Sequence, residues 1–360
     1  MKFSLLLLCL YLSVRPAYGQ DSQVMQAALK EQRFREAINL AKSRLQEHPG
    51  DVLATHVLGR AYHHLKPDSP YRYYYDSSNY YLLQALALDK ERTWVSHWSA
   101  YYLAENYFIQ GKNASCREMM LKALRLNKTE TASFSTKRLA QRSNLGDFFD
   151  NWVTIQSEHF IFHFQDTAAI RSMARFINSH EDAFVRNNKI FQAQLPKKID
   201  YYVWSDATAA RRILGAPLGF TVPDLALCNV RTNQTVGHEL THVLSHWGWG
   251  LPVQHKSRLI NEGVAVCFDG GVRDKDELAA TVLKGQPYKS ILEIWNNDAE
   301  IPEEILYPVA GAFLGWLHHM LSPEEFRSLI KNQTPAQLQQ LAGDRYAQLI
   351  ADFNALIGFR

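Results

Sequence analysis

The sequence predicts an α+β protein whose N-terminal part is all α-helical. Three observations predict this class. Apolar residues recur at helical spacing from about residue 21 to residue 142. The composition then changes near Gly146, and the segment 152–164 alternates as a β-strand does. A second strand-like run, 199–204, precedes a helix that Asp206 can cap. At 360 residues the chain is long enough for two domains.

The first residues are typical of a secretory signal peptide. Lys2 supplies a positive charge, residues 3–14 form an almost unbroken apolar run, and small residues at Ala17 and Gly19 suit a signal peptidase. A membrane anchor is the weaker interpretation, because Arg15 and Pro16 end the run well short of the roughly 20 residues that span a bilayer. We therefore expect a signal peptide over residues 1–19, no stable membrane span after its cleavage, and export of the rest, either secreted or to the cell envelope (the periplasm in a bacterium).

Residues 20–145 are expected to form helical repeats. The first helix is predicted over 24–45, and others over 52–65, 78–88, 94–112 and 114–127. Three helix ends have similar sequences at intervals of roughly forty residues: LQEHPGD, LALDKE and LRLNKT. The segment resembles a degenerate tetratricopeptide array with a Tyr-rich insert, although an ordinary helical bundle stays an alternative. Such an array implies a protein partner, for which the aromatic anchors would include Trp94, Trp98, Tyr101 and Tyr102.

Residues 146–360 are expected to form the α+β domain. Along 152–164 the pattern places Phe160, Phe162 and Phe164 on one face of a strand. A helical stretch follows from about residue 167 to residue 194. The segment 218–230 is interrupted by proline, which suits an edge strand. The pattern becomes helical again at Thr235.

The motif HELTH begins three residues later. A helix places His238 and His242 one turn apart on the same face, where two imidazoles can share one metal ion. Glu239, next to the first histidine, can take a proton from a water at the metal. A five-residue match arises easily by chance, so its sequence context decides.

About twenty residues further on, the chain reads LINEGVA. Together with HELTH, this segment resembles the gluzincins, the zinc metallohydrolases that include thermolysin and the aminopeptidases. The resemblance implies Zn²⁺ as the cofactor, Glu262 as the third ligand and Glu239 as the catalytic base. The metzincin alternative would need Gly and His at the positions that Ser245 and Gly248 occupy.

The resemblance covers roughly residues 150–360, with two departures. The Gly-x-Met-Glu-Asn segment of aminopeptidases is absent, which speaks against recognition of a free N-terminus. Val266 stands where thermolysin-like enzymes carry an acidic residue behind the metal ligands. The stretch YPVAGAF resembles the same superfamily and makes Tyr307, at the expected start of a helix, our candidate for stabilising an oxyanion.

Several other histidines lie near the motif or in the same domain. His318 and His319 are rivals of Tyr307 for the same role. His246 continues the row of His238 and His242 and is interpreted as a supporting residue, because it lies too far along the helix to ligate with both. We assign no role to the remaining candidates, His159, His163 and His255.

Composition excludes some partners and leaves the cysteines open. The net charge of +3 and the lack of long Lys/Arg runs give no nucleic-acid footprint. Signal cleavage would leave Cys116, Cys228 and Cys267. A Cys228–Cys267 bridge is conceivable, and three buried thiols are the more ordinary outcome.

Together these observations predict an exported zinc metallopeptidase of the gluzincin type, with a peptide or protein substrate and an endopeptidase preferred. One alternative is a binding or scaffold protein that uses the helical repeats and carries a structural or vestigial metal site. Another is hydrolysis of a non-peptide bond at the same site.

Overall fold

The computed structural model describes residues 15–65, 71–145, 147–249, 255–271 and 274–359. The chain divides into two compact units, residues 1–149 and residues 150–360. The first is helical in its described part, and the second combines helices with one small sheet. The mixed α+β class is therefore confirmed at this level.

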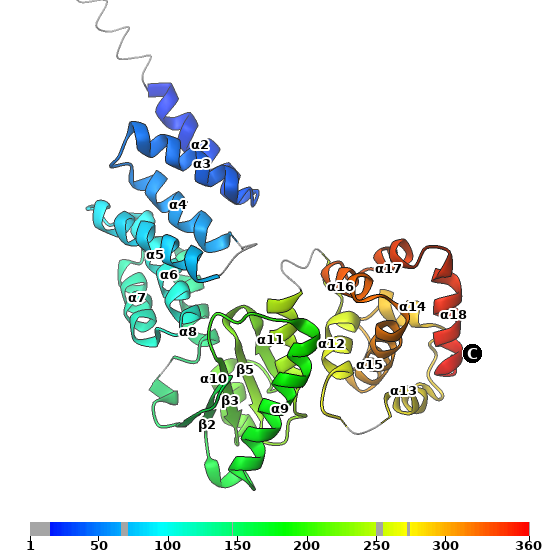
Figure 1. The fold of residues 1–360 in the computed structure, drawn as a ribbon. Helices are drawn as coiled ribbons and strands as arrows, with labels where there is room; N and C mark the ends of the chain where they lie inside the picture. Colours follow the sequence, from blue (N-terminus) through cyan, green and yellow to red (C-terminus); the bar gives the residue numbers. More distant parts are fainter. Residues whose placement is uncertain (1–14, 66–70, 146, 250–254, 272–273, 360) are drawn as a thin grey trace, which may run out of the picture. The chain divides into compact units, whose positions relative to one another are not determined.

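The described part of the first unit is a stack of helices (Figure 1). They are α2 (Arg15–Lys30), α3 (Phe34–Glu47), α4 (Val52–His64), α5 (Tyr71–Leu88), α6 (Trp94–Ile109), α7 (Asn113–Leu126) and α8 (Glu130–Arg142). Each helix packs against the next, and α2, α4, α6 and α8 also contact one another in succession. Consecutive helices thus pack in pairs, and α8 lies at the end of the stack.

Close packing and side-chain caps hold the stack together. A Cβ atom at Gly59 of α4 would lie 2.6 Å from the Cγ atom of Leu82, so only glycine allows α5 this close. Asp51 caps α4 by accepting from the backbone N–H of Ala54, and Thr93 and Thr129 cap α6 and α8 in the same way.

Two sequence expectations for this unit were wrong. The segment 24–45 is not one helix, because Gln32 adopts a left-handed conformation (φ 59°) that ends α2 before α3 begins. The helix predicted from Ser78 already begins at Tyr71, because the Tyr-rich insert is itself helical in α5.

The second unit is built on a five-stranded sheet. Its strands are β1 (Val153–Gln156), β2 (Phe160–Phe164), β3 (Ile199–Trp204), β4 (Phe220–Val222) and β5 (Leu227–Arg231), in the order β1-β2-β3-β5-β4. Strand β3 is parallel to both of its neighbours, β2 and β5. The edge strands β1 and β4 pair antiparallel with β2 and β5. As predicted, Phe160, Phe162 and Phe164 share one buried face, which packs against α9 (Met173–Phe191) through Phe176.

Two predicted strands are hairpins instead. The segment 152–164 turns back at Ser157, whose N–H donates to the carbonyl of Phe160, and so forms β1 and β2. The segment 218–230 is likewise not one edge strand. A 3₁₀ turn (Pro223–Leu225) and the left-handed Ala226 (φ 48°) reverse the chain, leaving β4 at the edge and β5 inside.

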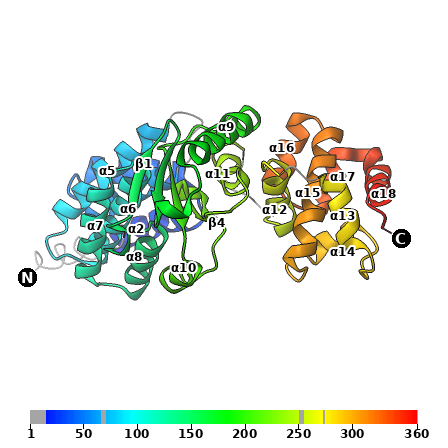
Figure 2. The same cartoon turned by 90° about the horizontal axis from the view of Figure 1, so that it is seen from below.

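Helices make up the rest of this unit (Figure 2). α10 (Ala207–Leu214) follows Asp206, which caps it as predicted. The remaining helices come after β5 in the chain. They are α11 (His238–Gly248), α12 (Arg258–Cys267), α13 (Lys275–Leu283), α14 (Ile291–Asn296), α15 (Glu303–Met320), α16 (Pro323–Lys331), α17 (Pro335–Ala342) and α18 (Tyr346–Leu356). Short 3₁₀ helices lie at Asp147–Phe149, Thr167–Ala169 and Gly343–Arg345.

The apolar N-terminal run of the predicted signal peptide, residues 3–14, lies outside the described residues. Among the helices that are described, none combines the length and apolarity needed to cross a bilayer.

Candidate metal centre

Helix α11 carries the two histidines of the HELTH motif. Gly237 precedes the helix with φ 97°, a conformation that favours glycine, and the helix starts directly at His238. Thr241 donates to the carbonyl of Gly237, and the Asn187 amide of α9 donates both to Thr241 and to the carbonyl of Phe268. The start of α11 is thereby tied to α9 and to the end of α12.

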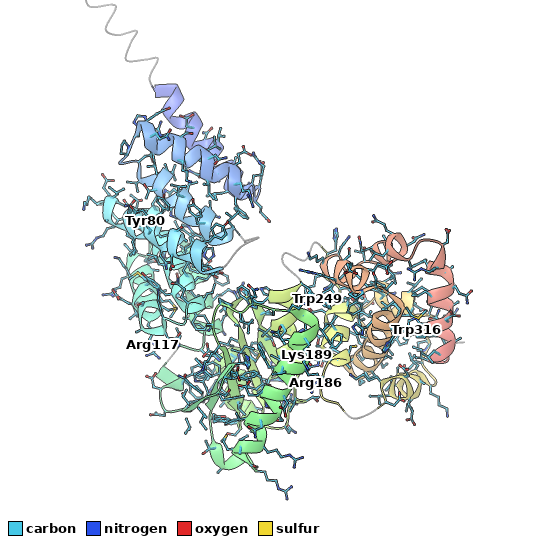
Figure 3. All side chains as sticks on the ribbon, viewed as in Figure 1. Tyr80, Arg117, Arg186, Lys189, Trp249 and Trp316 are labelled. Carbon is cyan, nitrogen blue, oxygen red and sulfur yellow. The ribbon has the colours of Figure 1, made fainter. Side chains whose placement is uncertain are left out.

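The other end of α11 is closely packed. A Cβ atom at Gly248 would lie 2.1 Å from the backbone carbonyl oxygen of Phe191, so the backbones of α11 and α9 come this close only because residue 248 is glycine. Trp249, labelled in Figure 3, follows the helix and packs against the rings of Phe191 and Phe326. Both ends of the helix are therefore fixed.

Helix α12 presents Glu262. Ser257 caps its first turn and donates to Asp298, whose carboxylate also accepts from the backbone N–H of Leu259. Gln333 accepts from the N–H of Ser257. These contacts fix the helix at its N-terminus, one turn before Glu262.

The neighbours of Glu262 in the sequence Asn261-Glu262-Gly263 each have a structural role. The Asn261 amide donates to Oε1 of Glu262 at 3.2 Å, which leaves Oε2 to face the histidines. A Cβ atom at Gly263 would lie 2.7 Å from the carbonyl oxygen of Ala310, so glycine is what lets α12 lie directly on α15. On the same interface a Cβ at Gly311 would meet Val266 at 2.3 Å. Val266, which departs from the thermolysin pattern, therefore occupies the space left by a second glycine.

The three predicted ligands lie together. The Nε2 atoms of His238 and His242 are 3.4 Å and 3.5 Å from Oε2 of Glu262. One donor atom from each residue lies within 4.8 Å of the others, and this is the one such His/Cys/Asp/Glu group among the described residues. Two imidazole nitrogens and one carboxylate oxygen are a donor set that zinc uses in catalytic sites, so these residues fit the ion.

Opposite charges stabilise the arrangement of this cluster. Burial alone would lower the pKa of His238, but the hydrogen bond to Glu262 and the charge of Glu239 raise it above its usual value. Burial alone would raise the pKa of Glu262, but its hydrogen bonds to His238 and His242 hold it well below the usual range. The carboxylate is therefore ionised and faces two imidazoles, as a ligand must.

Glu239 is buried beside the cluster and has two side-chain partners. Thr221 on β4 donates to Oε2 of Glu239 at 2.6 Å, and Gln234 donates more weakly to Oε1 at 3.4 Å. The same hydroxyl oxygen lies 3.1 Å from the backbone carbonyl oxygen of Glu239. The edge strand of the sheet thus orients the carboxylate of the predicted base.

Tyr307 also lies at the cluster. Its ring stacks on His238, with centroids 6.0 Å apart and planes at 22°, and the guanidinium of Arg258 lies 5.8 Å from the ring centroid. Burial and the charge of Glu262 raise the pKa of Tyr307, so its hydroxyl stays protonated at neutral pH. Tyr307 is not at a helix start, because α15 begins one turn earlier at Glu303.

Other residues from the sequence prediction lie elsewhere. His318 packs edge-on against Phe268 and Phe326, and His319 is exposed. His246 is not part of the three-residue cluster. His159 pairs with Glu181 and His163 with Asp200, while His255 contributes a backbone carbonyl to Gln333. Cys116, Cys228 and Cys267 are free thiols, so the conceivable Cys228–Cys267 bridge is absent.

Four residues of the site were missed from the sequence: Thr221, Gln234, Asn261 and Arg258. Asn261 and Arg258 had a usable signal, because they lie one and four positions before Glu262 on the same helix. Thr221 had none, since its contact with Glu239 depends on the β4–β5 hairpin, which the sequence pattern does not show. Gln234 lies in the turn before α11, and no pattern marks its contact with Glu239.

In comparisons with known proteins, no family model, no curated protein and no solved structure matches this chain.

Proposed function

We propose that this chain is a zinc-dependent hydrolase that cleaves peptide bonds as an endopeptidase of the gluzincin type. The observation that carries the proposal is the convergence of His238, His242 and Glu262 within 4.8 Å, with the Glu239 carboxylate alongside. Three protein ligands leave a further position open, as catalytic zinc sites require.

Zinc in this position would lower the pKa of a water molecule and polarise the substrate carbonyl. Glu239 would take the proton at its carboxylate and later deliver it to the leaving amine. The hydrogen bond from Thr221 would aim that carboxylate during both transfers. Tyr307 would donate its hydroxyl hydrogen bond to the oxyanion, a role that needs the protonated phenol.

The edge strand supports a peptide substrate. β4 pairs with β5 on one side and is the last strand of the sheet, so its other side can pair with an extended chain. Thr221 belongs to this strand and contacts the base directly. A peptide added along β4 would therefore lie beside Glu239, whereas a non-peptide substrate would make no use of the strand.

Peptide-library cleavage with a matched variant tests the proposal. Zinc-loaded wild-type protein should cut internal bonds of mixed peptides. Glu239→Gln, which keeps the shape of the side chain but removes the base, should reduce cleavage at least about a hundredfold at equal zinc content. Zinc-loaded wild-type protein that cuts no peptide of the library would reject this function and favour a binding or scaffold protein with a structural metal site.

A further inference from the structure

The first unit contains a cavity of about 530 Å³ between α5, the start of α6 and α7. Four cations line it: Lys90 and Arg92 from the α5–α6 turn, and Lys122 and Arg125 from α7. Figure 3 labels Tyr80 on α5 and Arg117 on α7, the two helices that supply most of the lining. The cavity belongs to the first unit alone and takes no residue of the metal centre.

The charge of this cavity is not neutralised within the described chain. None of the four cations lies within 4.0 Å of a described carboxylate oxygen. Asp89 also lines the cavity, but one of its oxygens already accepts four hydrogen bonds from the backbone and hydroxyl groups of Thr93 and Ser96. Glu118 is the other acid of the lining. The lining therefore carries four positive charges against the two negative charges of Asp89 and Glu118. Of the four cations, Arg125 also donates from Nε to the backbone carbonyl of Leu121.

Apolar side chains continue from the cavity along both helices. Leu86, Ala87 and Leu126 line it. Leu83 precedes Leu86 by three positions on α5 and is 45% exposed, and Leu121 precedes Arg125 by four on α7 and is 57% exposed. Residues at these spacings share one face of a helix. The surface is consequently apolar along the helices and cationic at the cavity.

We propose that this surface binds an acidic amphipathic segment of a partner protein, with carboxylates at Lys90, Arg92, Lys122 and Arg125 and apolar side chains at Leu83 and Leu121. The cations select acidic side chains by charge complementarity. The exposed leucines give a peptide apolar contacts that a small inorganic anion would not use. This proposal does not depend on the metal centre.

Binding of a defined probe to the full-length chain tests it. The probe is a fluorescein-labelled peptide of Leu, Glu and Asp residues. Its binding is measured by fluorescence anisotropy at about 0.15 M salt, where charges more than about 8 Å apart are largely screened. Lys122→Glu combined with Arg125→Glu should weaken binding at least about tenfold. The control combines Lys30→Glu with Lys137→Glu, two exposed cations outside the cavity, and carries the same change of net charge. It should bind the probe within about twofold of wild type, because the charge change alone acts only at long range.

A second pair of measurements tests the apolar part. Leu83→Ser combined with Leu121→Ser should weaken binding about fivefold without changing the melting temperature, because both side chains are exposed. The proposal fails if the cavity variant binds like the control variant, or if a peptide with Lys in place of its acids binds equally well. It also fails if a probe with Ser in place of Leu binds as tightly and inorganic phosphate displaces it, since the cavity would then be a plain anion site.

Discussion

The hydroxyl of Thr221 donates a 2.6 Å hydrogen bond to the carboxylate of Glu239. The donor lies on the edge strand β4 and the acceptor on helix α11, so one contact joins the surface suited to an extended peptide with the predicted base. Glu239 is 2% exposed, and a buried carboxylate needs such donors to remain oriented. We therefore expect this contact to affect the catalysis proposed above.

Removing that hydroxyl should slow catalysis without removing the metal. Thr221→Val keeps the shape of the side chain but loses a hydrogen bond to a charged group, which contributes about 1.5–3 kcal/mol. We expect kcat to fall about ten- to hundredfold, with unchanged zinc content and a nearly unchanged KM. Thr221→Ser, which keeps the hydroxyl, should recover most of the activity. Equal loss in both variants would show that the methyl packing matters and the hydrogen bond does not.

Gly263→Ala tests the packing that presents Glu262. The added methyl would meet the backbone carbonyl of Ala310, which cannot move without shifting α15. Overpacking of this kind costs about 1–3 kcal/mol, so the free energy of unfolding should fall by that amount and zinc affinity should fall with it. Gly50→Ala is the matched control, because its Cβ would meet nothing within 4 Å. Urea denaturation and a zinc-competition assay measure the two effects.

How much of this structure is predictable from sequence depends on the range of the interactions. His238 and His242 are predictable as a pair because helical spacing is local, and Asp206 because a cap acts within three residues. The helix break at Gln32 is not predictable from the sequence, because a non-glycine residue in a left-handed conformation does not change the spacing of the apolar residues. Residues 152–164 keep an alternating pattern through the turn at Ser157, so a hairpin reads as one strand.

The same limit applies to the site. Glu262 is predictable from the resemblance, which includes its spacing from HELTH, but not from local geometry, since only packing of α12 beside α11 brings its carboxylate to the histidines. Thr221 could not be found, because its partner Glu239 lies eighteen positions away on another element. Tertiary packing therefore sets the arrangement of the site, even where the sequence identifies the residues that form it.

Tyr307→Phe should separate Tyr307 from its two rivals as electrophile, His318 and His319. The variant loses only a hydroxyl, so zinc, fold and KM should stay while kcat falls on the order of a hundredfold, as for a lost oxyanion donor. His318→Ala should have a much smaller effect, because that ring packs among Phe268 and Phe326. Normal turnover by Tyr307→Phe together with a large loss of turnover in His318→Ala would show that Tyr307 is not the electrophile.

The first unit should lose stability in mild acid through His56. Burial, with the charge of Arg60, lowers the pKa of His56 from 6.5 to about 3. The unfolded chain therefore takes up the proton first as the pH falls, and the stability present above pH 6.5 is lost progressively toward pH 3. Between pH 6.5 and pH 5 the loss should be about 2 kcal/mol.

His56→Asn offers the control, because asparagine can keep the contact with Ser99 without titrating. Amide hydrogen exchange in α4, corrected for the intrinsic effect of pH on exchange, should show a smaller pH-dependent loss of protection in this variant. If wild type and His56→Asn lose protection equally between pH 6.5 and pH 5, the titration of His56 is not the cause.

The metal content of the purified chain tests the central claim most directly. Mass spectrometry of dialysed protein should find about one zinc per chain in the wild type and in Glu239→Gln, whose mutated residue is a base and not a ligand. His238→Ala and Glu262→Ala should each lose the metal, because each removes one of only three protein ligands. A wild-type chain that binds no zinc when supplied with it, or zinc retained in full by both ligand variants, would contradict the account.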